Sequence, residues 1–339
     1  MTGNSNPWYN LHMEKLSNET NSILELFKTY KNLRPSHILK MKKLSKKNLH
    51  KHLNTLQNRG YIKKSGVAPV VYYTCVDKKV IVSEIDNIPF EDFSIIESNY
   101  LYLSASGERL SGVLGFKEWC TLSKGDFNKN IKDYLLVLKA CNKIKEKGLI
   151  NGSSKILSGG GSIDIDSLYF SDFYTLDRFG KSKLGQLIFL AKTSGNLDIA
   201  REIIKIIKPS VLNLIKAKKI NYVGYIPPTV KRKTQFMKQL EDLLDLNIPK
   251  ISLHKAANSI PQKSLRKLED RIKNARETIY IDPTSNINGN VLLIDDATGS
   301  GATLSQTAKK LKKLNKNIKS IIGYTVVGSN KGFDVISEV

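Results

Sequence analysis

The chain lacks the features of a secreted or membrane-spanning protein. No segment approaches the roughly 18 consecutive apolar residues of a transmembrane helix, and the first residues have neither the positive start nor the apolar core of a signal peptide. Cys75, Cys120 and Cys141 are odd in number and include no Cys-x-x-Cys pair, which argues against a disulfide framework and a zinc ribbon. We therefore expect a cytoplasmic protein whose thiols are reduced and buried.

Acidic residues are scarce. The 339 residues include 31 Asp and Glu against 54 Lys and Arg, a formal net charge of +23. Residues 1–80 alone hold 15 basic and 4 acidic residues. A lysine-rich composition common to a whole proteome would raise the overall charge, but it explains this local concentration less well. The distribution indicates a polyanionic partner.

The N-terminal region has the pattern of three short helices and a β-hairpin. Helical patterns cover 20–30, 35–41 and 45–60, the last running from a Ser N-cap to a Gly stop. β-rich runs at 61–64 and 70–74 then flank the turn sequence Ser-Gly-Val-Ala-Pro. This order predicts a small α+β domain.

The third helical segment has two different faces. Leu49, Leu53 and Leu56 recur at i, i+4 and i+7 and predict an inward stripe. The residues predicted to contact DNA, on the opposite face and the hairpin, are Lys46, Lys47, His50, Lys51, Asn54, Lys63 and Lys64. The region resembles the winged helix-turn-helix of bacterial transcription regulators, which implies a helix in the major groove and hairpin lysines on phosphates. The alternatives are a helix face that is only solvated and a protein–protein module.

The middle of the chain is less informative. A strand is predicted at 100–103 and a helix at 130–144, before a Ser/Gly-rich linker at 151–162. Phe116 and Trp119 favour packing over a cofactor clamp, because no convergent polar residues accompany them. We interpret this region as a connector or a dimerisation module.

The most informative stretch is 291–303, Val-Leu-Leu-Ile-Asp-Asp-Ala-Thr-Gly-Ser-Gly-Ala-Thr. Its apolar run predicts a buried parallel strand, and the periodicity from Leu304 onward predicts a helix. The loop between them can hold a phosphate on backbone N–H groups at the helix N-terminus. Asp295 and Asp296 are expected to accept hydrogen bonds from vicinal ribose hydroxyls rather than to form a salt bridge. The stretch predicts a site for ribose 5-phosphate.

This stretch resembles the motif of type I phosphoribosyltransferases that binds 5-phosphoribosyl 1-diphosphate (PRPP), with Thr-Gly-Ser-Gly-Ala-Thr where that family has Thr-Thr-Gly-x-Thr. Three further blocks follow the order of the competence protein ComF family over about 165–330. Block 170–192 has a basic turn and a helix ending in lysine, and block 223–233 resembles a core strand with its pyrophosphate loop. Block 255–274 resembles the mobile hood loop, Arg…Pro-x-Gln-x-x-Leu…Arg-x-x-Asn.

The resemblance implies an α/β fold with a doubly wound parallel sheet of the type I phosphoribosyltransferase kind, behind an N-terminal winged-helix domain. The catalytic residues that it implies are Asp295, Asp296 and Arg271. The residues that it implies for PRPP binding are Pro227, Pro228, Arg232, Lys233, Lys255, Thr298, Gly299, Ser300, Gly301, Ala302 and Thr303. Positive side chains would neutralise the pyrophosphate, and Mg²⁺ would be held mostly by ligand oxygens and water, without a protein metal cluster.

Two departures from the family pattern affect the expected chemistry. The family's zinc-ribbon N-terminus is replaced by the winged-helix pattern. Its Arg-Gly-Phe-Asn block after the pyrophosphate loop is shortened to Lys-Arg-Lys-Thr-Gln-Phe at 231–236, and the hood region contains no obvious reader of a nucleobase. These departures put catalysis in doubt more than PRPP binding.

We predict three regions: a winged helix at 1–80, a connector or dimerisation region at 81–155, and a PRPP-binding domain at 156–339. The favoured function is a homodimeric DNA-binding regulator that senses PRPP or a related sugar phosphate. One alternative is an active Mg²⁺-dependent phosphoribosyltransferase acting on a base or nucleic acid. Another is a ComF-like accessory factor in DNA uptake or mobile-element defence.

Overall fold

The computed structural model describes residues 16–30, 32–58, 61–66, 71–75, 88–105, 107–154, 164–228, 232–256, 265, 267–282 and 286–329. The chain forms two compact units, Met1–Asn130 (unit 1) and Ile131–Val339 (unit 2). Across the described residues, no helix combines the length and the apolar character needed to cross a bilayer.

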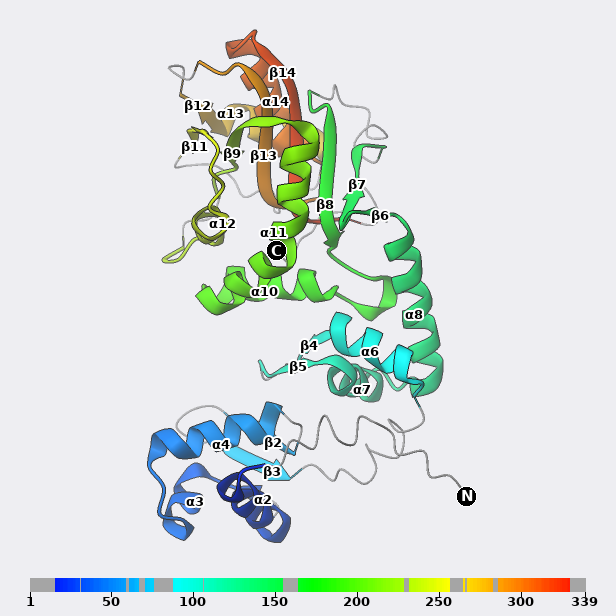
Figure 1. Ribbon diagram of the computed structural model, residues 1–339, viewed down its shortest axis with the longest axis vertical. Helices are drawn as coiled ribbons and strands as arrows, with labels where there is room; N and C mark the ends of the chain where they lie inside the picture. The colour runs from blue at the N-terminus through cyan, green and yellow to red at the C-terminus, as the bar shows by residue number, and fades with distance from the viewer. Residues whose placement is uncertain are drawn as a thin grey trace. The chain divides into compact units, whose positions relative to one another are not determined.

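The first part of unit 1 contains the three predicted helices and the predicted hairpin (Figure 1). Its elements are α2 (Asn18–Tyr30), β1 (Asn32–Leu33), α3 (Pro35–Met41), α4 (Lys46–Asn58), β2 (Ile62–Ser65) and β3 (Tyr72–Cys75). The strands form an antiparallel sheet in the order β1-β3-β2. The inward stripe of α4 is confirmed, because Leu49, Leu53 and Leu56 are at most 1% exposed in a core shared with Phe27 and Tyr73.

The N-cap predicted for α4 is confirmed by a hydrogen bond in which the Asn48 N–H donates to Ser45 Oγ at 3.2 Å. Such a cap satisfies one of the backbone donors that the first helical turn leaves without an intrahelical partner. The predicted stop at Gly60 lies outside the described residues.

The second part of unit 1 consists of helices and a strand pair packed around Phe116. Its elements are α6 (Phe90–Asn99), β4 (Leu101–Leu103), β5 (Arg109–Ser111), α7 (Gly112–Leu122) and the start of α8 (Phe127–Lys143). Phe116 is fully buried, with an edge-to-face contact to Tyr100 at 5.0 Å and with Trp119 at 5.8 Å between ring centroids. The interpretation of Phe116 as a packing residue is therefore confirmed.

Two polar contacts join these parts of unit 1. Gln57 Nε2 donates to Glu108 Oε1 at 3.2 Å, and Lys63 Nζ lies 2.7 Å from Glu118 Oε1. The thiols follow the prediction only in part, since Cys120 and Cys141 are buried but Cys75 at the end of β3 is half-buried.

Unit 2 is built on a seven-stranded mixed sheet in the order β10-β9-β13-β14-β8-β7-β6 (Figure 1). The strands are β6 (Lys145–Glu146), β7 (Leu149–Asn151), β8 (Ser167–Phe173), β9 (Ile220–Tyr225), β10 (Lys250–Ile251), β13 (Gly289–Thr298) and β14 (Ile318–Gly328). Strands β10 to β8 in this order run parallel, while β7 and β6 are antiparallel. The predicted parallel α/β sheet is confirmed in its larger part, and the antiparallel strands β7 and β6 at one edge depart from the prediction. Strands β6 and β7 come from the region interpreted as a connector.

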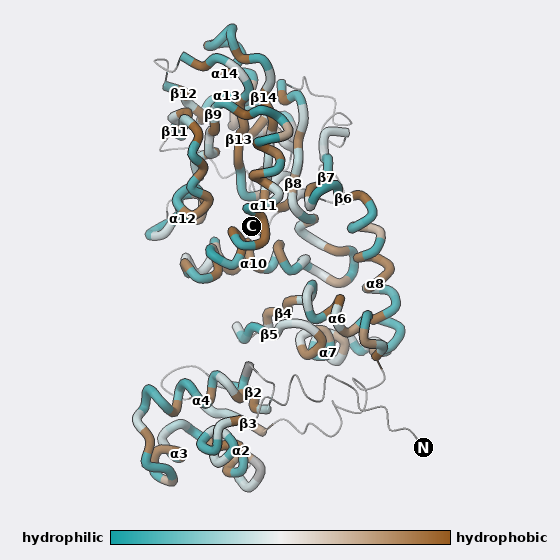
Figure 2. Tube along the Cα trace, in the orientation of Figure 1, coloured by the Kyte–Doolittle hydropathy of each residue, from teal (hydrophilic) through white to brown (hydrophobic). Residues whose placement is uncertain are grey.

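Helices cover both faces of this sheet. They are α10 (Lys183–Ser194), α11 (Leu197–Lys218), α12 (Phe236–Leu244), α13 (Leu268–Thr278) and α14 (Ala302–Leu314), accompanied by η1 (Asp177–Phe179) and the strand pair β11 (Leu253–Lys255) and β12 (Ile279–Ile281). Val291 and Leu293 pack with Leu304 of α14, so the alternate residues Leu292 and Ile294 point to the opposite face. The four strand residues 291–294 are fully buried. Figure 2 shows β13 and β14 as strongly hydrophobic segments.

Candidate functional site

The candidate site lies at the carboxyl ends of β9 and β13. From β9 the chain passes through α12 to β10 on one side, and from β13 it passes through α14 to β14 on the other. Ligands of open α/β sheets bind where neighbouring strands send their connections in opposite directions. β13 continues past its last pairing with β9, Ile294 with Tyr225, and the residues up to Thr298 pair only with β14.

The acidic pair lies on β13 itself, and not in the loop that the sequence pattern predicted. The strand continues because Asp295 pairs with Thr325 of β14. Successive side chains on a strand point to opposite faces, so the two carboxylates have different surroundings. Asp295 Oδ1 accepts a hydrogen bond from the Asp296 N–H at 2.8 Å, whereas Asp296 Oδ2 forms an ion pair with Lys192 Nζ at 2.8 Å. The expectation that the pair forms no salt bridge is wrong for Asp296.

Burial shifts the pKa of both an acid and a base in this region. Burial raises the pKa of Asp295 to about 7, and repulsion from Asp296 adds to this shift, against the opposing charges of Lys192 and Lys255. Burial lowers the pKa of Lys255 on β11, while the charges of Asp295 and Asp296 act to raise it. A half-buried cluster of two acids and two lysines therefore brings together residues of β11, β13 and α10.

Lys192 is the residue of this cluster to which the sequence analysis gave no role. It lies in the last turn of α10, whose N-cap Ser182 accepts from the Gly185 N–H at 3.0 Å and donates its hydroxyl to the Phe173 carbonyl at 2.6 Å. That second bond ties the helix to the end of β8. A signal was present in the sequence, since a lysine at a helix C-terminus is favoured by the helix dipole, but its partner is 104 residues away.

Arg232, predicted to belong to the pyrophosphate loop, is also held at this end of α10. Its Nη1 donates to the Lys192 carbonyl at 2.7 Å, and its own carbonyl accepts from Gln235 Nε2 at 3.3 Å. The loop after β9 is thus connected to the acidic pair through Lys192.

The loop after β13 leads directly into α14. The helix begins at Ala302, two residues before the predicted Leu304. Thr298 is buried and its carbonyl accepts from the Ser329 N–H at 2.9 Å, and Ser300 Oγ accepts from the Ala302 N–H at 3.4 Å. Gly301 has φ +71°, a left-handed conformation that a side chain disfavours. Gly299 also belongs to this turn, and Thr303 lies in the first turn of α14.

The other predicted residues differ in burial and in their contacts. Arg271 on α13 is buried, donates its Nε to the Leu265 carbonyl at 2.8 Å, and has a pKa lowered by burial. Its catalytic role stays a prediction. Pro227 is half-buried, while Pro228 and Lys233 are exposed. Residues 257–264 of the predicted hood loop lie outside the described residues.

Two buried polar atoms near this region were not predicted. The Tyr225 hydroxyl at the end of β9 and Gln239 Oε1 on α12 have no hydrogen-bond partner within the described chain. Gln239 is oriented by its Nε2, which donates to the Gly195 carbonyl at 3.1 Å. Burial raises the pKa of Tyr225, so its hydroxyl stays protonated. A buried polar atom without a partner is a candidate for a ligand hydrogen bond.

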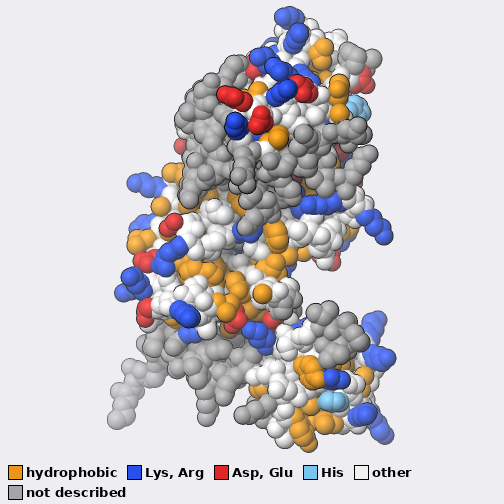
Figure 3. All heavy atoms as spheres, turned by 180° about the vertical axis from the view of Figure 1, so that it is seen from behind, with side chains coloured by type: hydrophobic (Ala, Val, Ile, Leu, Met, Phe, Trp, Pro, Cys, Tyr) orange, Lys and Arg blue, Asp and Glu red, His pale blue; other side chains and the backbone are white. Residues whose placement is uncertain are grey.

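A second candidate surface, in unit 1, is the predicted DNA-contacting face of α4. Its exposed residues are Lys46, Lys47, His50, Lys51 and Asn54. Figure 3 shows Lys and Arg side chains along the edge of this part of the unit. Lys64 on β2 is exposed as well, whereas Lys63 is half-buried and paired with Glu118. The structure thus brings together most of the predicted residues, and Lys63 already has an intramolecular partner.

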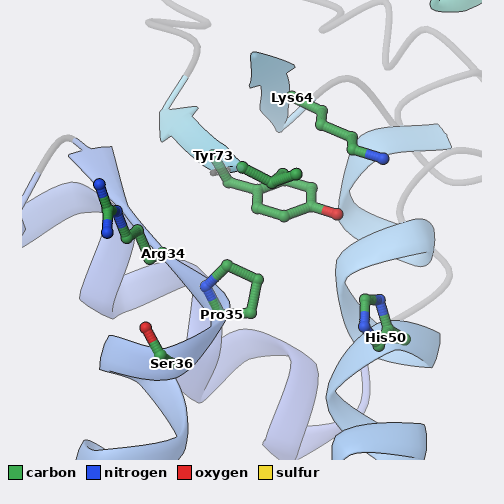
Figure 4. A pocket seen from close by; sticks show the side chains of 7 residues that line it. Arg34, Pro35, Ser36, His50, Lys64 and Tyr73 are labelled. Atoms are coloured by element: carbon green, nitrogen blue, oxygen red, sulfur yellow. The ribbon is translucent and has the colours of Figure 1, made fainter. Parts of the chain in front are cut away.

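A pocket of about 300 Å³ lies between the start of α3, α4 and the hairpin. It is lined by Arg34, Pro35, Ser36, His50, Lys64, Val71 and Tyr73. Figure 4 shows the Lys64 amine and the Tyr73 hydroxyl on the side where α4 carries His50. Arg34 is held by its guanidinium, which lies 4.5 Å above the Tyr72 ring and donates to the Tyr72 hydroxyl. No lining residue is acidic, so the pocket favours an anionic group.

Comparisons with known proteins add little to this geometry. Neither a protein-family model nor a curated protein matches the chain. Among solved structures, an adenine phosphoribosyltransferase is 16% identical over 43% of this chain and 77% of its own, with a TM-score of 0.26. Adenine phosphoribosyltransferase from Leishmania tarentolae is 14% identical over 46% of this chain and 91% of its own, with a TM-score of 0.27. These scores are too low to carry an argument about function. A function can therefore be inferred only from the strand order and the side chains of the site.

Proposed function

We propose that this protein is a DNA-binding regulator whose unit 2 binds PRPP or a related phosphorylated ribose. The observation that carries the proposal is the meeting of an acidic pair, a loop of small residues and the N-terminus of α14 at the switch point between β9 and β13. Helix N-termini bind phosphate, and carboxylates accept hydrogen bonds from sugar hydroxyls. One strand end therefore supplies groups for both ends of a ribose 5-phosphate.

The diphosphate of PRPP would lie toward the basic residues of the same region. Arg232 follows β9, and Lys192 and Lys255 act on the acidic pair. Mg²⁺ would be held here mostly by ligand oxygens and water, the coordination that this hard cation prefers. When bound with PRPP, it would neutralise diphosphate charge.

Unit 1 would supply the DNA-binding part, as a winged helix. The element order α2-β1-α3-α4-β2-β3 with an antiparallel three-stranded sheet supports this assignment. α4 would be the helix in the major groove, and Lys64 beside the pocket would reach a phosphate. A homodimer would place two such helices on two half-sites.

Isothermal titration of the full chain with PRPP and Mg²⁺ tests the sugar-phosphate site. The double variant Asp295→Asn, Asp296→Asn should lose measurable binding, because each charge-assisted hydrogen bond contributes about 1.5–3 kcal/mol. Asp198→Asn is the matched control, since Asp198 is exposed on α11 and should leave binding unchanged. Unchanged PRPP affinity in the double variant would exclude the site.

Titrating PRPP with and without duplex DNA tests the regulatory proposal. A sensor must bind PRPP with different affinity in its DNA-bound and DNA-free forms, by roughly 5–150-fold if its coupling is typical. Equal affinities together with acceptor-dependent pyrophosphate release would contradict the regulatory proposal and support an enzyme. Equal affinities without turnover would favour an accessory role of the ComF kind.

A second candidate function, an active phosphoribosyltransferase, is favoured by the pKa of about 7 at Asp295. A carboxyl with that pKa can accept a proton from an attacking nucleophile near neutral pH. Release of pyrophosphate from PRPP, followed with nucleobases or DNA as acceptors, tests this function. A regulator without turnover releases none above the rate in buffer.

A further inference from the structure

Lys192 connects the two halves of the proposed sugar-phosphate site. Its amine forms the 2.8 Å ion pair with Asp296, and the two side chains are only 16% and 17% exposed. Its carbonyl accepts the 2.7 Å hydrogen bond from Arg232. The same residue thus contacts the group proposed for the ribose hydroxyls and the group proposed for the diphosphate.

A sugar hydroxyl alone is a poor competitor for Lys192. To reach Asp296 Oδ2, a neutral hydroxyl must replace a charged amine, and the mostly buried amine would then lack a counter-ion. Separating such a pair is costly because the environment is largely shielded from water. A lysine amine is a compact charge on a flexible stem and can turn to a nearby anion. A diphosphate at Arg232 offers such an anion, with more charge than one carboxylate.

We propose that Lys192 is a specificity-determining residue that exchanges partners, leaving Asp296 for the ligand's diphosphate as the vicinal diol takes its place on the carboxylate. This inference rests on the proposed function, because it assumes that the sugar and the diphosphate bind here. The exchange makes the two events cooperative. Diphosphate draws Lys192 away and exposes Asp296 to the diol, and by linkage the diol favours diphosphate to the same extent. The site thereby selects ligands that carry both groups.

Calorimetry with two separate probes tests this coupling in the full chain. Ribose 5-phosphate is titrated with and without saturating inorganic pyrophosphate, both in the presence of Mg²⁺. In the wild type, pyrophosphate should raise the affinity for ribose 5-phosphate by roughly 5–150-fold, the usual range of coupling between sites. In Lys192→Met the enhancement should disappear, because no charge can move from Asp296 to the diphosphate. Lys192→Gln keeps a polar group beside Asp296 and should also lose the enhancement. This variant replaces Lys192→Met in the experiment if the Met variant does not fold.

Lys183→Met is the matched control, because Lys183 begins the same helix that Lys192 nearly ends. This variant should keep the full enhancement. Binding of both probes without coupling in the wild type, or undiminished coupling in the Lys192 variants, would overturn the exchange and leave the proposed site intact. Failure of the wild type to bind either probe would overturn the proposed function and the exchange with it.

Discussion

Replacing Asp295 with Asn should stabilise unit 2 in a manner that depends on pH. Burial, followed by repulsion from Asp296, raises the pKa of Asp295 from 3.8 to about 7. The folded chain therefore binds this proton more tightly than the unfolded chain, and ionising the carboxyl costs folding free energy as the pH rises. The cost grows between about pH 4 and pH 7 and reaches at most about 4 kcal/mol above that range, because a tenfold difference in proton affinity corresponds to about 1.4 kcal/mol. Asn keeps the oxygen that accepts from the Asp296 N–H.

Differential scanning calorimetry of the full chain at pH 5 and pH 8 measures this effect. The gain in Tm of Asp295→Asn should be larger at pH 8, at about 2–4 °C per kcal/mol for a unit of this size. Asp198→Asn is the control, since that side chain is 83% exposed and its ion pair with Arg201 should contribute about 1 kcal/mol or less at either pH. An equal gain at the two pH values, or a loss of stability at pH 8, would refute the electrostatic reasoning.

Four further substitutions test the turn, the core and the nucleic-acid surface. Gly301→Ala should lower stability by about 1–2 kcal/mol, because φ is +71° at this position; an unchanged Tm would contradict the assigned turn. Leu293→Ala should cost about 2–5 kcal/mol in urea unfolding, since the side chain is fully buried between β13 and α14, and a loss below about 1 kcal/mol would place it outside the core. Lys47→Ala should reduce the log-log salt slope of duplex DNA binding by about 0.9, the contribution of one phosphate contact. Lys63→Ala should change it less because Lys63 is paired with Glu118, and equal changes for the two variants would show that DNA breaks this ion pair.

Local patterns in the sequence predicted several of the helices and strands, above all in the first part of unit 1. The leucine stripe of α4 and its Ser45 cap could be read directly, because both depend on residues within one or two helical turns. The end of β13 could not be predicted in this way, because the residue pattern changes from apolar to acidic after Ile294. The strand continues through Thr298 because β14 supplies a pairing partner up to Gly328. Pairing between distant segments extended a strand that its own residues would have ended.

The same distinction separates the residues of the candidate site. Their order along the chain was enough to identify the acidic pair and the small-residue loop, since a strand end and a helix start impose that order locally. Order along the chain was not enough for the contacts of Lys192. Its ion pair with Asp296 joins residues 104 positions apart, and its hydrogen bond from Arg232 joins residues 40 positions apart. Burial in that cluster also sets the pKa of Asp295.

The sequence by itself determined the three helices and the hairpin in the first part of unit 1, the buried strand at the centre of unit 2, and the residue types available to a sugar phosphate. Each of these depends on side-chain chemistry or short-range periodicity. Only the tertiary structure decided the strand order that makes β9 and β13 neighbours, the separation of Asp295 and Asp296 onto two faces, and the partners of Lys192 and Lys63. Those features depend on which distant segments pack together and on how little water reaches the charges between them.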